Sequence, residues 1–195
     1  MGKIKSALEI ALERTESVKS DKGSIGQFEA RQKGKKLANE FLEGSVKSLE
    51  EEIKKTAKDE QENFKQGIFD ILITRICLPI AKEELQNIEA AAKGLLAIIK
   101  DKRFAEIVKE LPKIMNQYTE EAAQYENAIK QQYAPKLRQK EEEITRRLGR
   151  EVKLDPYQDP EFVAFYNQHM NALKANYQAV LDDIKEEAAR LFGEL

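Results

Sequence analysis

An unbroken heptad pattern in the second half of the chain most strongly constrains its fold. Eight apolar residues follow one another there at alternating steps of four and three: Phe104, Val108, Leu111, Met115, Tyr118, Ala122, Tyr125 and Ile129. This spacing places them on one face of a helix that packs against another helix. Pro112 lies inside the pattern and predicts a kink or a break. The pattern continues by two steps of four to Tyr133 and Leu137, which predicts a bend near Pro135.

A second long helix is predicted at the C-terminal end. Its stripe consists of Phe162, Tyr166, Met170, Leu173, Tyr177, Val180, Ile184, Ala188 and Leu191. Residues 149–159 contain the segment LDPYQDP and are predicted to form the loop before it. Asp159 is placed to cap this helix, and Pro160 suits its first position.

The most apolar stretch of the chain is residues 67–100, and its part from Ile68 to Ala81 is expected to be buried on most sides. A membrane span would need about 20 nearly uncharged residues, and Asp70, Arg75 and Lys82 interrupt the run earlier. Its β-branched residues would also suit a strand, but the flanking sequence is strongly helical. We therefore predict a helix from near Ser48 towards Lys100, with a kink or a break at residues 76–78 caused by Pro79.

The N-terminal region is predicted to form two helices. Residues 1–20 carry a stripe at heptad spacing, made of Ile4, Leu8, Ala11, Thr15 and Val18. Lys22 and Gly23 are expected to end this helix, and Ser24 with Gln27 has the spacing of a capping box that would start the next. We treat residues 1–22 as a possible docking or exchange element, which packs on its own chain or on another.

Composition agrees with a helical protein of one domain, residues 1–195. Charged residues make up 35% of the chain, against about 25% in an average protein, and only five prolines occur. We predict an all-α fold: an elongated, coiled-coil-like antiparallel bundle of five or six helices, with kinks near Pro79, Pro112 and Pro135.

Charge and cysteine content limit the possible partners and the cellular compartment of the protein. A net charge of −2 favours neither nucleic acid nor anionic membranes as partners. The single cysteine excludes an intramolecular disulfide framework, and no apolar signal segment is visible near the N-terminus. We therefore expect a cytoplasmic protein without integral membrane association.

The opening segment IKSALEIALERTE, Ile4 to Glu16, resembles a family of uncharacterised bacterial all-helical proteins. The resemblance covers this short segment only. It implies a helical fold and supplies no activity, cofactor or site residue.

Few residues suggest chemistry. The one histidine, His169, cannot supply the two Glu-x-x-His motifs of a di-metal bundle. Cys77 lies between bulky aliphatic residues and is expected to be buried as a small hydrophobe. No catalytic, cofactor-binding or metal-binding residue is predicted, and no cofactor. If a ligand pocket exists, its candidate residues are Asp70, Arg75, Cys77, Tyr118, Tyr125, Tyr166 and His169.

Three functions remain open from the sequence. The leading hypothesis is a non-enzymatic structural or interaction protein that associates through its helices, with a second copy of itself or another helical protein as partner. The alternative is a bundle that binds a small molecule or lipid in a cavity beneath residues 68–81. An enzyme that uses carboxylates from several helices would need them to converge in a cleft with raised pKa values.

Overall fold

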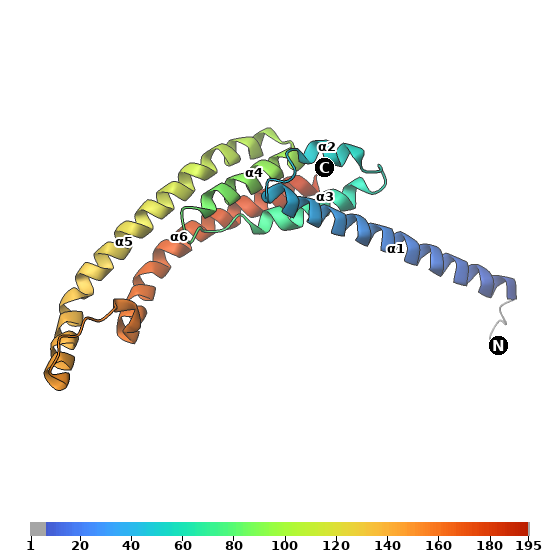
Figure 1. Cartoon of the computed structure of the whole chain (residues 1–195). Helices are drawn as coiled ribbons and strands as arrows, with labels where there is room; N and C mark the ends of the chain where they lie inside the picture. Colours follow the sequence, from blue (N-terminus) through green and yellow to red (C-terminus); the bar gives the residue numbers. More distant parts are fainter. Residues whose placement is uncertain (1–6, 195) are drawn as a thin grey trace, which may run out of the picture.

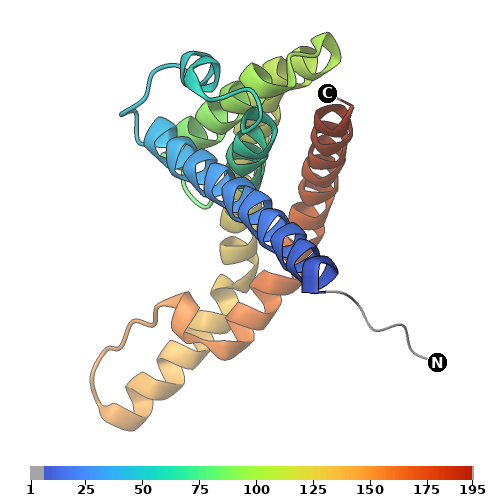
Figure 2. The same ribbon diagram turned by 90° about the vertical axis from the view of Figure 1, so that its right-hand side faces the viewer.

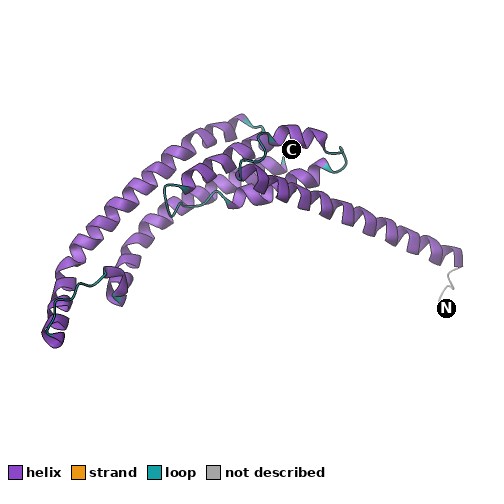
Figure 3. Cartoon of the chain, in the orientation of Figure 1, coloured by secondary structure: helices purple, strands orange, loops and turns teal. Residues whose placement is uncertain are grey.

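The computed structural model describes the backbone of residues 7–194 and the side chains of residues 24–194. Six α-helices and one short 3₁₀ helix follow one another, and no strand occurs within this range (Figure 3). They are α1 (Ala7–Leu42), α2 (Leu49–Lys55), α3 (Gln61–Thr74), α4 (Glu84–Ile99), α5 (Lys102–Leu148), η1 (Pro156–Gln158) and α6 (Pro160–Gly193). The predicted all-α fold is confirmed.

The helices form an elongated, arched molecule (Figure 1). We call its central part the body, where α2, α3 and α4 meet the C-terminal part of α1, the start of α5 and the end of α6. The remainder of α5 and α6 forms a hairpin that leaves the body on one side, with residues 149–159 at its tip. The N-terminal part of α1 leaves the body on the other side, as Figure 2 also shows.

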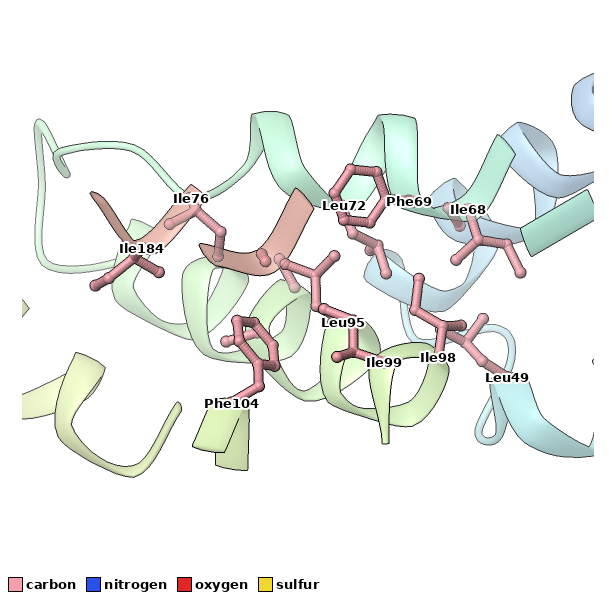
Figure 4. Packing of buried hydrophobic residues seen from close by; sticks show 14 of the residues in the cluster. Leu49, Ile68, Phe69, Leu72, Ile76, Leu95, Ile98, Ile99, Phe104 and Ile184 are labelled. Atoms are coloured by element: carbon pink, nitrogen blue, oxygen red, sulfur yellow. The ribbon is translucent and has the colours of Figure 1, made fainter. Parts of the chain in front are cut away.

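The core of the body draws apolar side chains from all six helices. Figure 4 shows side chains of α2 to α6 that point into one interior, among them Leu49, Leu72, Leu95, Phe104 and Ile184. The apolar stretch of residues 67–100 supplies ten of its 22 buried residues. The burial predicted for residues 68–81 is confirmed in α3 and at Ile76, whereas Ile80 is 94% exposed. A second, smaller cluster lies between α5 and α6 in the hairpin and consists of Ile129, Tyr133, Phe162, Met170 and Leu173.

The predicted helix from Ser48 to Lys100 is divided into three. Ser48 caps α2 as expected, since the Glu51 amide donates to its hydroxyl at 3.4 Å. The break at Pro79 is confirmed, because α3 ends at Thr74 and α4 begins at Glu84. A further break after α2 was not predicted. There Thr56 adopts an extended backbone and donates its hydroxyl to the Glu52 carbonyl at 3.2 Å, and Gln61 binds the Thr56 carbonyl at 3.0 Å.

One predicted helix end is wrong, and of the kink or break predicted at Pro112 the break is excluded. The helix end at Lys22 and Gly23 does not occur, because α1 is continuous from Ala7 to Leu42. A glycine inside a helix costs only about 1 kcal/mol relative to alanine, which is not enough by itself to end the helix. The break considered at Pro112 is also absent: α5 runs through Pro112 and Pro135 and follows a curve (Figure 1).

The C-terminal helix begins as predicted, with Asp159 as its cap and Pro160 in its first turn. Its apolar stripe is shifted by one residue in one place. Leu181 is completely buried, whereas Val180 is 40% exposed.

Candidate functional site

The N-terminal part of α1 is the helical segment that extends furthest from the body (Figure 1). We call residues 7–29 the arm, because they precede Ala30, the first buried residue of the described part of α1. The arm extends away from the body and from the α5–α6 hairpin (Figure 1). Near its base Ile25 is 55% exposed and Phe28 is 63% exposed. The stripe from Ile4 to Val18 lies outside the described side chains.

Two glycines allow α1 and α3 to pack in close contact. A Cβ atom added at Gly34 would lie 2.0 Å from the Phe64 carbonyl oxygen, and one added at Gly67 would lie 2.0 Å from the Arg31 carbonyl oxygen. The backbones of the two helices therefore touch, as small residues allow. A glycine inside a helical pattern, such as Gly34, is the available sequence signal for such close approach. This contact fixes the direction in which α1 leaves the body.

Asp70 holds the same helix pair together electrostatically. Its carboxylate accepts from Arg31 Nε at 2.7 Å and from Gln66 at 3.1 Å, and Lys35 lies 3.7 Å away. Partial burial alone would raise the pKa of Asp70, but the bonds from Arg31 and Gln66 outweigh it, so the pKa lies below its ordinary value. Asp70 is thus an ion-paired residue of the α1–α3 contact.

A separate hollow lies where the α3–α4 loop faces the middle of the α5–α6 hairpin. We call it the tyrosine groove. It has a volume of about 500 Å³ and is lined by Leu78, Pro79, Ile80, Ala81, Lys82, Tyr118, Thr119, Ala122, Ala123, Glu126, Tyr166, Met170 and Lys174. Of the seven candidate pocket residues, Tyr118 and Tyr166 are among those that line it.

The other five candidates lie elsewhere. Asp70 binds Arg31, and Arg75 caps the exposed end of α3. The expected burial of Cys77 is wrong: the residue is exposed, because the loop after α3 turns its aliphatic neighbours Ile76 and Leu78 inward instead. Tyr125 is 49% exposed although it belongs to the heptad. His169 is also exposed, and its ring lies edge-on to Phe165 at 4.4 Å.

The polar groups of the tyrosine groove suit hydrogen bonding. Burial raises the pKa of Tyr118 and of Tyr166, so both hydroxyls stay protonated at neutral pH. Glu126 accepts from Lys130 at 2.6 Å and from the Tyr157 hydroxyl at 2.7 Å, and its pKa is lowered by these bonds. Lys82 and Lys174 add two exposed cations to the lining. The sequence did not point to Glu126 or Lys174, since charged residues on helices carry no distinctive pattern.

No group of three potential metal-binding side chains was found in the part of the chain that the structure describes. None of the helices in that part combines the length and the apolar character needed to cross a bilayer.

The chain was compared with protein families, curated proteins and solved structures. No curated protein and no solved structure matches it. A family model described as "Family of unknown function (DUF6657)" matches residues 50–190, which contain α2 to α5 and nearly all of α6. The segment Ile4 to Glu16, on which the sequence resemblance rests, lies outside that match. By the extent of the match, this chain belongs to the DUF6657 family of unknown function.

Proposed function

We propose that this protein is a non-enzymatic interaction protein that works through helix–helix association, with the arm of α1 as the surface it presents. The observation that carries the proposal is the arm itself: a helix that leaves the body with Ile25 and Phe28 exposed. Large apolar side chains gathered on one exposed element are typical of interaction sites.

The continuity of α1 strengthens this proposal. Because α1 does not end at Lys22, the heptad positions Leu8, Ala11, Thr15 and Val18 lie on the same helix as Ile25. Their heptad spacing continues through Lys22 to Ile25. A stripe of this length is typical of helices that pair in coiled coils. The glycine contact between α1 and α3 would hold the arm in a defined direction, so that little ordering is needed when a partner binds.

An enzymatic role is less well supported. Among the described side chains, the carboxylates whose pKa departs from the ordinary value are all lowered, not raised: Asp70, Asp101, Glu126, Asp159, Glu161 and Glu187. Hydrogen bonds from cationic side chains contribute to each of these shifts. A carboxylic acid poised for proton transfer would show the opposite shift.

The proposal includes a cellular location, a source and a partner for the protein. A cytoplasmic location fits the exposed thiol of Cys77, the only cysteine of the chain, because reducing compartments preserve free thiols. A bacterial source fits the resemblance of residues 4–16. The partner is a second copy of the chain or another helical protein.

Light scattering on a sizing column tests the proposal. The full chain is expected to elute with a mass above the 22.4 kDa of one chain, and Ile25→Asp with Phe28→Asp is expected to return it towards that value. Both side chains are exposed, so the double variant keeps its fold, which circular dichroism checks. Gln27→Asp with Gln32→Asp is the matched control, since it adds the same charge at exposed polar positions of the same helix. A wild-type chain that stays at 22.4 kDa at all concentrations would contradict self-association.

The tyrosine groove supports a second candidate function, the binding of an anionic single-chain amphiphile. Its apolar lining, the tyrosine hydroxyls and the cations Lys82 and Lys174 suit an acyl chain with a carboxylate head. A fluorophore attached to the exposed Cys77, next to Leu78, should report the titration of oleate. Ala123→Trp should fill the groove and abolish the signal, whereas Ala175→Trp, also exposed on the hairpin but outside the lining, should leave it unchanged.

A further inference from the structure

A second hollow lies between α5 and α6, within the span where the two helices reach the body. Its floor is apolar and consists of Ile107 and Ile114 from α5 and Val180 and Ile184 from α6. Its volume is about 530 Å³. Val180 is 40% exposed there, while its neighbour Leu181 is completely buried in the core of the body. With one face, α5 and α6 thus pack against the core of the body, and they leave the face that carries this hollow open.

The charged residues around this floor are all acidic. Glu106 and Glu110 line it from α5, and Asp183 and Glu187 line it from α6. We call the floor and these four residues the acidic groove.

Three of the four carboxylates bind cations of their own helix. Glu106 binds Lys109 at 2.6 Å and Glu110 binds Lys113 at 2.8 Å, and Glu187 binds Arg190 at 2.6 Å. Such exposed pairs contribute only about 0–1 kcal/mol each, so an incoming cation can replace them at little cost. An apolar floor with acidic edges is complementary to an amphipathic helix whose apolar stripe has basic edges.

The arm has this pattern in its sequence. With Leu8, Thr15 and Lys22 at heptad position a and Ala11, Val18 and Ile25 at position d, the adjoining e and g positions include Arg14 and Lys19. One acidic residue, Asp21, also falls at a g position.

Of the glutamates of the arm, Glu9, Glu13 and Glu16 fall at positions b and f, away from the stripe, whereas Glu29 falls at position a. Within residues 7–25, the positions beside the apolar stripe thus carry two basic residues and one acidic residue, and the glutamates lie on the other side.

We infer that the arm of one copy lies in the acidic groove of a second copy. This inference rests on the proposed function and names its partner and its receptor surface. The arm cannot reach the groove of its own chain, because the glycine contact holds α1 in a direction that leads away from the body, where the groove lies (Figure 1). At about 1.5 Å per residue, residues 7–28 extend about 33 Å, enough to cover the roughly two and a half helical turns of α5 from Glu106 to Ile114. Because arm and groove are different surfaces, the contact is of the head-to-tail kind.

Charge reversal and its compensation test the inference in the full chain. Glu110→Lys with Asp183→Lys is expected to shift the mass in light scattering to that of one chain, and so is Arg14→Glu with Lys19→Glu. The four substitutions together are expected to restore association. Glu142→Lys with Glu143→Lys is the control, since it makes the same change of charge on a distal, exposed part of α5. All these variants alter exposed or arm positions, and circular dichroism verifies their helical content.

The outcomes separate the inference from the function on which it rests. Loss of association in both pairs and its recovery in the fourfold variant would support the contact. Glu110→Lys with Asp183→Lys could leave the mass unchanged while Ile25→Asp with Phe28→Asp dissociates the protein. In that case the arm binds a surface other than the acidic groove. The inference is then overturned, but the proposed function stands. Failure of the fourfold variant to recover also overturns the inference. A wild-type mass of one chain overturns the inference and the self-association in the proposed function, and leaves another helical protein as the partner.

Discussion

The hydroxyl of Tyr133 on α5 donates to the carboxylate of Asp159, the residue that caps α6, at a distance of 2.8 Å. Lys140 binds the same carboxylate at 2.7 Å, and the Glu161 amide donates to it at 3.1 Å. One buried carboxylate therefore starts α6 and ties it to the helix beside it. Tyr133 also contacts Phe162 edge-on, which continues this attachment into the cluster between the two helices.

We expect Tyr133→Phe to lower the free energy of unfolding by about 1 kcal/mol, the usual worth of one buried hydrogen bond whose acceptor keeps other partners. Denaturant titration followed by circular dichroism measures the change. Tyr125→Phe is the control: this tyrosine is 49% exposed and should alter stability by less than about 0.5 kcal/mol. Equal effects of the two substitutions would show that the bond to Asp159 adds no stability.

Acid should weaken the attachment at Asp159. Burial alone would raise the pKa of this carboxyl group, but the hydrogen bonds from Lys140 and Tyr133 prevail and lower it. Because the folded pKa lies below the unfolded one, the stabilisation is complete above the ordinary pKa of an aspartate, about 3.9, and declines as the pH falls below it.

Asp159→Asn should therefore show a flatter dependence of Tm on pH between about 5 and 3 than the wild type. Asparagine can still cap the helix, so the difference reports the charge. The control is Glu143→Gln, which removes one carboxylate at an exposed position of α5. A slope for Asp159→Asn that matches the wild type would contradict the assignment of this charge to stability.

The contact between α1 and α3 should not tolerate a methyl group. Gly67→Ala would place its Cβ 2.0 Å from the Arg31 carbonyl oxygen, a backbone atom that cannot move without the helix. We expect a loss of about 1–3 kcal/mol or more in the free energy of unfolding, as for other overpacked positions.

Gly26→Ala is the matched control for this substitution. Nothing lies within 4 Å of a Cβ added there, so the variant should gain about 0.5–1 kcal/mol from helix propensity. Denaturant titration measures both, and a neutral or stabilising Gly67→Ala would mean that the two helices separate easily.

The register of α6 can be tested with neighbouring residues. Leu181 is completely buried and Val180 is 40% exposed, so Leu181→Ala should cost about 2–5 kcal/mol and Val180→Ala about 0.5 kcal/mol or less. Thermal unfolding of the two variants measures both losses of stability. Similar losses at both positions would be inconsistent with the observed packing.

Helical periodicity and end signals predicted most of the fold. The heptad from Phe104 to Ile129, the cap at Asp159 and the break at Pro79 were all recognisable, because each depends on spacing or on backbone chemistry within a few residues. The continuity of α1 past Gly23 and of α5 past Pro112 was not. At Pro112 the local cost of proline competes with packing of α5 against other helices, which one sequence does not show. Gly23 lies in the arm, away from such packing, and its cost of about 1 kcal/mol is too small to end the helix.

The candidate sites were harder to predict for the same reason. Tyr118 and Tyr166 lie together in the tyrosine groove because their helices are neighbours, and their stripes indicated this. Cys77 was expected to be buried because of its neighbours in sequence, but a loop can turn such neighbours inward and leave the residue between them exposed. The acidic groove depends on how α5 and α6 are rotated relative to each other. The sequence did not show this rotation, because the apolar stripe of α6 is displaced by one residue, from Val180 to Leu181.

The two prolines of α5 give the hairpin a mechanical character. A helix resists bending through the hydrogen bonds that link successive turns, and each proline removes one of these links, to the carbonyl groups of Val108 and Gln131. The helix is therefore expected to bend more easily at two positions, at Pro112 within the body and at Pro135 near the tip. Bending is expected to concentrate at the outer position, so that the loop at residues 149–159 swings while the acidic groove, nearer the body, keeps its shape.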